Sequence, residues 1–297
     1  MAIAACLLWS TAFVGVKIGL EYTTPIQFGG IRFFLAGLYI LPFCGNIRSS
    51  LRQIRKNWKQ VLRLAIFQTF LLYTGFYIGI SMVPASLTAI IIGASPLFSA
   101  IMAHILLKDD RLNFRTMGSI VVGMAGVVII AASRENFSWQ EGKEFWGILI
   151  LVAAMLAGSI GNVVVVKYND GLPPLLLNSS QLMIGGAGLF LLSIPFEGLT
   201  FSINVVPYYI SLLWLSLMSA TAFSIWFILL RRPGIKVSVL NVWKFLIPVF
   251  GALLSWIILP DDNPELIAVI GMVFIALSLV VLNANHLKKN HKLAGSK

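Results

Sequence analysis

Stretches of about 20 apolar residues recur along this chain from one end to the other, and they constrain its fold more than any other feature. At a helical rise of 1.5 Å per residue, about 20 residues cross the roughly 30 Å hydrocarbon core of a bilayer. Charged residues make up 11% of the chain and hydrophobic residues 58%, whereas an ordinary globular domain has roughly 25% charged residues. The sequence therefore predicts an all-α polytopic membrane protein.

Polar residues, prolines and glycines divide the apolar sequence into about ten predicted spans. They cover residues 3–20, 26–45, 61–83, 86–107, 114–132, 145–167, 174–194, 206–230, 237–259 and 265–284. The polar stretches between them are too short to hold a soluble domain. No basic n-region precedes the first apolar run, so we expect Met1–Gly19 to be an uncleaved span rather than a signal peptide.

Basic residues concentrate in alternate connections, which orients the predicted spans. With the N-terminus inside, the outer segments hold only Arg134 and Lys143. The cytoplasmic segments hold Arg48, Arg52, Arg55, Lys56, Lys59, Arg63, Lys108, Arg111, Arg115, Lys167, Arg231, Arg232, Lys236, Lys288, Lys289, Lys292 and Lys297. Because Lys and Arg are retained on the cytoplasmic side, both termini should be cytoplasmic. We expect the membrane to be a bacterial inner membrane. The same rule explains the net charge of +11, so we expect no nucleic-acid partner.

Segments about 150 residues apart resemble each other. Pro96-Leu97-Phe98 matches Pro248-Val249-Phe250, and similar offsets relate Lys17 to Lys167, Pro25 to Pro174, Arg32 to Gln181 and Asp109-Asp110 to Asp261-Asp262. A second copy of five spans must enter the membrane with the opposite orientation, because five is odd. We therefore expect two inverted five-helix repeats, residues 1–133 and 145–285, with an external linker at 134–144 and a basic cytoplasmic tail at 286–297.

Several of these motifs resemble the drug/metabolite transporter superfamily, specifically its ten-span EamA-type permeases. They are Trp9-Ser10-Thr11-Ala12-Phe13, Arg32-Phe33 followed by Ala36-Gly37, and the paired helices that begin at Pro96 and Pro248. The resemblance covers essentially the whole chain. It implies a central cavity lined mostly by spans 1, 3, 4, 6, 8 and 9, with spans 5 and 10 at the periphery.

This chain departs from the family at one recurrent position. The family often has Gly-Glu after each of the paired helices, where this chain has Lys108-Asp109-Asp110 and Pro260-Asp261-Asp262. Each helix thus still ends in an acid. The resemblance implies that the structural role of that acid is retained.

Away from the span ends, the predicted spans contain two basic residues, Arg32 and Lys244, and no Asp or Glu. A central Arg or Lys costs about 2.5–3.5 kcal/mol on insertion scales, which favours a functional use. Lys244 lies roughly 10 Å into the ninth span, near the same face as Asn241 and Pro248, and this indicates a kinked polar wall. The alternatives are that Lys244 snorkels to the cytoplasmic headgroups and that Arg32 braces neighbouring helices.

Polar and aromatic side chains supply further candidates. Tyr73 and Tyr77 continue a stripe from Thr69, and Ser95 belongs to a stripe with Thr88 and Ser99; each stripe could equally serve helix-to-helix hydrogen bonding. Trp9, Trp214, Trp226 and Trp243 could line a cavity or anchor at the interface, and we expect Trp9 and Trp243 to line the cavity. The predicted substrate-binding residues are Lys244, Asn241, Trp9, Trp243, Tyr73, Tyr77, Ser95 and Arg32.

The sequence thus predicts a secondary transporter that exports a small polar or amphipathic metabolite by alternating access. The basic interior without carboxylates favours an amino-acid-like, zwitterionic or anionic solute. The alternative is a polytopic enzyme acting on lipid headgroups, but Asp109-Asp110 and Asp261-Asp262 fall on opposite sides of the membrane and cannot form one site. A sensor or scaffold would need an appended domain. Cys6 and Cys44 indicate packing residues, and we expect no catalytic residue, cofactor or metal.

Overall fold

The computed structural model describes residues 1–83, 85–132, 143–168, 171–200, 205–258 and 266–294, and within these ranges all regular structure is helical. In chain order the elements are α1 (Ala2–Ser10), α2 (Ala12–Leu20), α3 (Pro25–Ile40), η1 (Leu41–Cys44), α4 (Ile47–Lys56), α5 (Trp58–Leu64), η2 (Ala65–Leu71), α6 (Leu72–Ile80), α7 (Ala85–Gly93), α8 (Ser95–Leu106), α9 (Phe114–Ala132), α10 (Lys143–Lys167), α11 (Pro174–Glu197), α12 (Val206–Leu230), α13 (Val237–Val242), η3 (Trp243–Phe245), α14 (Leu246–Ile258) and α15 (Leu266–Ala294).

These elements form the predicted spans, so the prediction of an all-α polytopic membrane protein of about ten helices is confirmed. Among the described residues, six segments are long and apolar enough to cross a bilayer: 2–20, 25–44, 58–80, 143–167, 174–197 and 206–230. Shorter apolar helices occupy the positions of the fourth, fifth, ninth and tenth spans. Several ends differ from the prediction: the third span is 58–80, α10 begins at Lys143, α11 continues to Glu197 and α15 continues to Ala294. Glu144 favours the earlier start of α10, since a carboxylate in the first turn is stabilised by the helix dipole.

Proline interrupts the fourth and ninth spans at equivalent points. Pro96 follows the break between α7 and α8, and Pro248 follows the 3₁₀ turn η3 between α13 and α14. A proline has no N–H, and its ring clashes with the carbonyl four residues earlier, which in the ninth span belongs to Lys244. Lys244 therefore lies in the irregular turn rather than in a regular α-helix.

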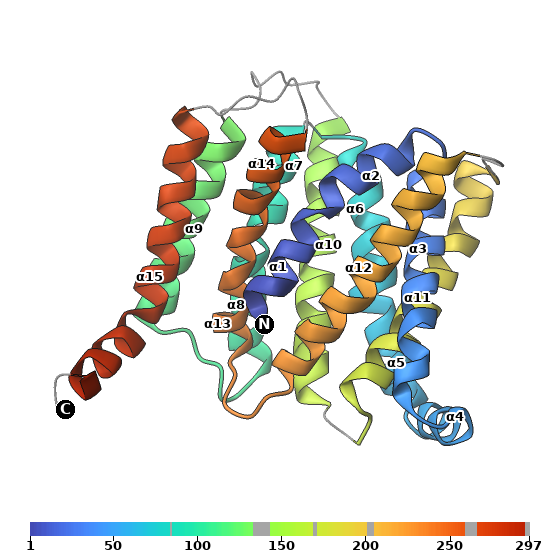
Figure 1. Cartoon of the computed structure of the whole chain (residues 1–297), viewed down its shortest axis with the longest axis horizontal. Coiled ribbons are helices and arrows are strands. Elements are labelled where there is room, and N and C mark those ends of the chain that lie inside the picture. The colour runs from blue at the N-terminus through green and yellow to red at the C-terminus, as the bar shows by residue number, and fades with distance from the viewer. Residues whose placement is uncertain (84, 133–142, 169–170, 201–204, 259–265, 295–297) are drawn as a thin grey trace.

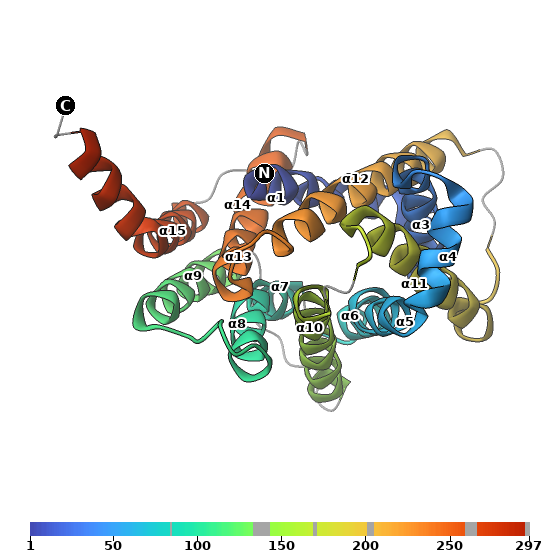
Figure 2. The ribbon, with the colours of Figure 1, turned by 90° about the horizontal axis from the view of Figure 1, so that it is seen from below.

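Two long helix pairs lie at opposite ends of the molecule. α9 packs along α15, and α3 packs along α11 (Figure 2). Glycine permits direct backbone contact in both pairs: a Cβ on Gly126 would lie 2.6 Å from the carbonyl oxygen of Gly271, and one on Gly186 would lie 2.8 Å from that of Gly30. Such close approach is the usual basis of helix association in membranes.

The fourth and ninth spans also meet each other, where α8 packs against α13. The carboxylate of Asp110, which follows α8, accepts the backbone N–H of Ser238 at 3.0 Å and also accepts its hydroxyl. Ser238 lies in the first turn of α13, so Asp110 satisfies donors at the start of that helix. This is a structural role for the acid at the end of the fourth span. Asp261 and Asp262 lie outside the described residues.

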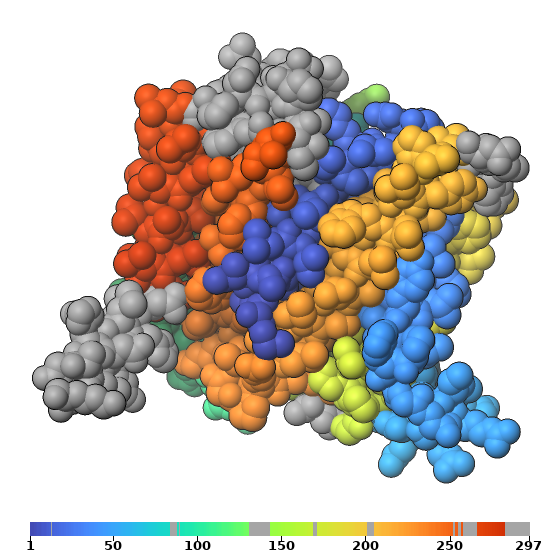
Figure 3. All heavy atoms as spheres, viewed as in Figure 1, coloured from blue at the N-terminus to red at the C-terminus, as the bar shows by residue number. Residues whose placement is uncertain are grey.

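The basic connections lie at one end of the bundle, at the bottom of Figure 1. This end, called the basic end below, carries α4 and the connections 107–113 and 231–236. The long helices run between it and the opposite end, whereas α4 crosses it (Figures 1 and 2). On the face seen in Figure 3, the first span lies on the surface between α12 and α14. The first span is thereby brought against the irregular turn of the ninth.

Candidate functional site

Lys244 lies between two tryptophans. Its Nζ atom is 4.9 Å from the ring centroid of Trp226 and 5.7 Å from that of Trp9. An ammonium over an indole face gains about 0.5–2 kcal/mol, with the larger values where water is excluded. The side chain thus has two aromatic partners, from spans 1 and 8. In the snorkelling alternative the ammonium would instead extend to the cytoplasmic headgroups.

Three hydrogen bonds surround the turn that carries Lys244. The thiol of Cys6 donates to the carbonyl of Trp243 at 3.3 Å, which joins α1 to η3. Asn241, which is fully buried, donates to the Val237 carbonyl at 2.9 Å and accepts from the Asn162 side chain at 3.2 Å. These contacts fix the turn from which Lys244 projects.

Aromatic rings extend from Lys244 across the bundle in one continuous chain. We call the chain Trp226, Trp9, Phe223, Phe33, Tyr73 and Tyr77 the aromatic array. Successive ring centroids are 5.1, 5.4, 6.3, 4.2 and 6.4 Å apart. Four of these separations fall within the range of about 4.5–7 Å for favourable aromatic pairs, and Phe33 and Tyr73 are slightly closer, at 4.2 Å. The array therefore connects spans 8, 1, 2 and 3 through direct side-chain contact.

Arg32 lies at the other end of the aromatic array. Its Cζ atom is 4.3 Å from the ring centroid of Phe33 and 5.9 Å from that of Tyr73. The side chain is 5% exposed, and its Nε atom has no hydrogen-bond partner among the described residues. A buried guanidinium N–H without a partner is costly, so this end of the array holds an unused donor.

The two cations lie at different depths in the bundle. α3 and α13 start at opposite ends (Figure 1). Arg32 lies seven residues past the first residue of α3, and Lys244, in the turn η3, lies seven residues past the first residue of α13. At 1.5 Å per residue each is about 10 Å from its own end, which leaves roughly 10 Å of depth between them across a 30 Å core. The aromatic array bridges this interval.

Five of the eight predicted site residues belong to this assembly: Lys244, Trp9, Tyr73, Tyr77 and Arg32. The other three have different surroundings. Asn241 pairs with Asn162, Trp243 is half-buried against the main hydrophobic core, and Ser95 begins α8 at the break in the fourth span. Substrate contact by these three stays a prediction.

The two predicted polar stripes bond to neighbouring helices or to their own backbone. Thr69 donates to Gln181 at 2.6 Å, and the hydroxyls of Ser99 and Ser159 are 3.2 Å apart. Thr88 donates to the Val83 carbonyl at 3.4 Å. Hydrogen bonding within and between helices therefore accounts for these three hydroxyls.

The predicted substrate-binding set leaves out three members of the aromatic array: Trp226, which the sequence offered as either a cavity wall or an interfacial anchor, and Phe33 and Phe223. Trp226 lies four residues before the end of α12, which is typical of an interfacial anchor, yet it is 1% exposed and is the ring closest to Lys244. The spacing of Phe223 and Trp226 on one helix face was the available signal. Span 2, which the family resemblance leaves out of the cavity lining, contributes Phe33 as well as Arg32.

None of the carboxylates that the structure describes lies in the middle of the bundle. The acids that the structure describes are Glu21, Asp109, Asp110, Glu144 and Glu197, and each lies at a helix end or in a connection. Glu197, for example, accepts the backbone N–H groups of Ile26 and Gln27 at 3.0 Å and so satisfies the start of α3. Fold and site together define a polytopic helical membrane protein with a cationic, aromatic interior.

The chain belongs to the EamA-like transporter family, whose model matches residues 1–132 and 145–284. This match confirms the resemblance that the sequence motifs indicated. The chain is therefore a membrane transporter of this family. Among its relatives is the "Uncharacterized transporter YoaV" of Bacillus subtilis, 25% identical over 267 residues that cover 88% of each chain.

Two further similarities extend over nearly the whole chain. A protein of Chlamydia trachomatis named S-adenosylmethionine/S-adenosylhomocysteine transporter is 23% identical over 289 residues, which cover 92% of this chain and 85% of that protein. One crystal structure superposes with a TM-score of 0.81 at 21% identity over 96% of both chains. At that identity the structural likeness shows the fold alone.

Proposed function

We propose that this protein is a secondary transporter for an amphipathic metabolite that carries a carboxylate, and that Lys244 binds this carboxylate. The observation that carries the proposal is the position of the Lys244 ammonium on the faces of Trp9 and Trp226. Because these contacts are with ring faces, the three N–H donors of the ammonium stay available to an anion. A substrate carboxylate would therefore gain charge-assisted hydrogen bonds without breaking an ion pair.

The aromatic array supports a substrate with a flat or apolar portion beside its carboxylate. Such a group can stack on the indole rings next to Lys244, since planar surfaces bind well to aromatic side chains. A relative named as an S-adenosylmethionine/S-adenosylhomocysteine transporter supports the same chemistry, because those compounds combine an amino-acid end with a planar base. The proposed class is zwitterionic or anionic metabolites of this amphipathic, amino-acid-like kind.

Alternating access between two inverted repeats is the proposed mechanism. Three observations support it. The family model matches the chain twice, in residues 1–132 and 145–284. The fourth and ninth spans break at equivalent prolines and pack against each other. The close contacts of Gly37 with Ser179 and of Gly186 with Gly30 each join spans 2 and 7, at positions related by the repeat offset.

Export is the proposed direction. Lys244 lies nearer the basic end of the bundle, and the positive-inside rule puts that end in the cytoplasm. The substrate would then meet Lys244 first from the cytoplasmic side and pass Arg32 later. An enzyme acting on lipid headgroups gains no support from Asp110, because its carboxylate is occupied by Ser238.

A thermal-shift screen of the purified protein tests the substrate class. The panel contains amino acids, S-adenosyl compounds, organic anions and neutral sugars. A ligand at 100 times its Kd stabilises the folded state by about 2.7 kcal/mol. We expect stabilisation by carboxylates that carry a flat or apolar group, and weaker stabilisation by their amides. Stabilisation by neutral sugars alone would contradict the proposal.

A further inference from the structure

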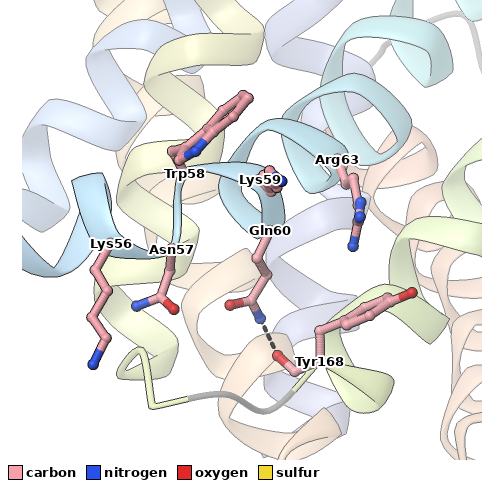
Figure 4. Close-up of a pocket in the computed structure, with 7 residues that line it drawn as sticks. All are labelled: Lys56, Asn57, Trp58, Lys59, Gln60, Arg63 and Tyr168. Atoms are coloured by element: carbon pink, nitrogen blue, oxygen red, sulfur yellow. Dashed lines mark hydrogen bonds between the residues drawn. The ribbon is translucent and has the colours of Figure 1, made fainter.

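A groove at the basic end of the bundle lies outside the aromatic array. It has a volume of about 330 Å³ and is lined by Lys56, Asn57, Trp58, Lys59, Gln60, Arg63 and Tyr168, which Figure 4 shows. These residues come from the junction of α4 and α5 and from the residue that follows α10. We call this feature the basic groove.

Three basic side chains line the basic groove. Lys56, Lys59 and Arg63 are all exposed, and residues 46–64 contain no Asp or Glu. Arg63 is held with its guanidinium carbon 5.1 Å from the ring centroid of Tyr168. A cluster of three cations attracts an anion that accepts several hydrogen bonds, such as a phosphate ester, for which Arg supplies a planar pair of donors.

One buried acceptor in the basic groove is unused. Gln60 is 7% exposed, and its amide nitrogen donates to the Tyr168 carbonyl, so its Oε1 atom points away from that bond (Figure 4). This oxygen has no hydrogen-bond partner among the described residues. A buried acceptor of this kind favours a ligand that has a hydroxyl donor beside its anionic group.

Helix α4 has the character of a helix at a membrane surface. Gly45 turns the chain with a φ of 84°, a conformation natural to glycine, and the Asn46 side chain then accepts the Arg48 N–H at 2.9 Å to start α4. Ile47 and Leu51 are 61% and 55% exposed. They line one stripe of α4, and Arg48, Arg52 and Arg55 line the adjacent stripe.

The position of Trp58 extends the apolar stripe to the groove. Trp58 is 53% exposed and follows α4 directly, and exposed tryptophan is typical of the headgroup level. Because α4 crosses the end of the bundle (Figures 1 and 2), its apolar stripe can rest on acyl chains while the cations meet headgroups. These features place the groove at the level of a lipid phosphate.

We infer that the basic groove is a binding site for one anionic glycerophospholipid whose headgroup carries hydroxyl groups, with phosphatidylglycerol as the fitting chemistry. Lys56, Lys59 and Arg63 bind the phosphate, and Gln60 Oε1 accepts a headgroup hydroxyl. The acyl chains lie against the apolar stripe of α4. The lipid would thereby fix the junction between α4 and α5, which connects spans 2 and 3.

Native mass spectrometry of the full chain in neutral detergent, titrated with phosphatidylglycerol, tests this inference. One variant removes the groove cations (Lys56→Gln, Lys59→Gln, Arg63→Gln). A matched control removes equal charge elsewhere at the basic end (Lys108→Gln, Arg111→Gln, Arg232→Gln). We expect the wild type and the control to bind one phosphatidylglycerol with affinities within about threefold of each other, and the groove variant to bind at least tenfold more weakly. Equal losses in both variants would overturn the site.

A second arm separates lipid from soluble phosphate. Glycerol 1-phosphate and inorganic phosphate are titrated separately into the wild type, with phosphatidylcholine as the uncharged lipid control. We expect neither soluble phosphate nor phosphatidylcholine to bind at the concentration that saturates phosphatidylglycerol. Binding of glycerol 1-phosphate as tight as that of the lipid would overturn the lipid assignment. So would equal binding of the two lipids.

Discussion

The carboxylate of Asp110 accepts both the backbone N–H and the hydroxyl of Ser238, and this contact ties the end of the fourth span to the start of the ninth. Ser238 is 1% exposed, so loss of the acceptor leaves two buried donors without a partner. Removal of a charged partner from buried donors costs about 1–3 kcal/mol.

Asp110→Ala should therefore lower thermal stability in detergent by several degrees. The neighbouring Asp109→Ala is the matched control, because Asp109 is exposed. Thermal unfolding followed by tryptophan fluorescence measures both variants. Equal melting temperatures for Asp110→Ala and Asp109→Ala would show that the cap contributes nothing.

Glycine at position 126 should be required for the packing of α9 on α15. A Cβ there would lie 2.6 Å from the Gly271 carbonyl oxygen, whereas a Cβ on Gly118 of the same helix meets nothing within 4 Å. Overpacking costs about 1–3 kcal/mol. Gly126→Val should reduce the monodisperse fraction after heating, as measured by size-exclusion chromatography, and Gly118→Val should not. Similar behaviour of the two variants would contradict the backbone contact.

The number of spans could be predicted from the sequence because it depends on the length of the apolar runs, and that length does not depend on how the helices pack. The interruption at Lys244 was also predictable, since a proline acts on its own helix. Asn241 shows where such reasoning stops. Its spacing predicts a face shared with Lys244, but the side-chain amide of Asn162, from another span, donates to its side-chain oxygen.

The aromatic array depends on which helices become neighbours, and no local pattern carries that information. Phe33 and Phe223 are ordinary apolar residues within their own spans, and only tertiary packing brings their ring centroids to 6.3 Å. The basic groove has the same origin. Its cations belong to one connection, but Tyr168 reaches it from the end of the sixth span.

Membrane orientation should follow the positive-inside rule. In a background without Cys6 and Cys44, a single cysteine at Gln53 or Lys289 should be shielded from an impermeant thiol reagent in intact cells. A cysteine at Gln140, which lies outside the described residues, should be labelled. Gel-shift labelling before and after lysis measures all three. Labelling of the cysteine at Gln53 in intact cells would show the opposite orientation. It would also contradict the proposed export direction.

Transport should not depend on a carboxylate inside the spans, because the described acids all lie at helix ends or in connections. We expect exchange of labelled for unlabelled substrate across proteoliposomes without an imposed pH gradient. Glu144→Gln and Glu197→Gln should preserve the exchange rate once corrected for folded protein. Uphill uptake that requires a pH gradient and disappears in either variant would refute this expectation.

Lys244→Met should preserve folding and insertion while impairing transport, because methionine keeps the apolar contact with Trp9 and Trp226 but removes the charge. Loss of a charge-assisted hydrogen bond costs about 1.5–3 kcal/mol, which corresponds to about a tenfold to hundredfold change. Lys244→Arg should recover transport only in part, since a planar guanidinium does not replace a compact ammonium. Lys17→Met, at an exposed lysine of the first span, is the matched control.

The decisive measurement is the transport of the ligand found in the thermal-shift screen, compared between wild type and Lys244→Met in proteoliposomes with equal amounts of folded protein. The account predicts that kcat/KM falls at least tenfold in Lys244→Met, stays within about twofold in Lys17→Met, and no longer distinguishes the carboxylate substrate from its amide in Lys244→Met. An unchanged kcat/KM with unchanged preference for the carboxylate would contradict the assignment of Lys244 as the substrate-binding cation.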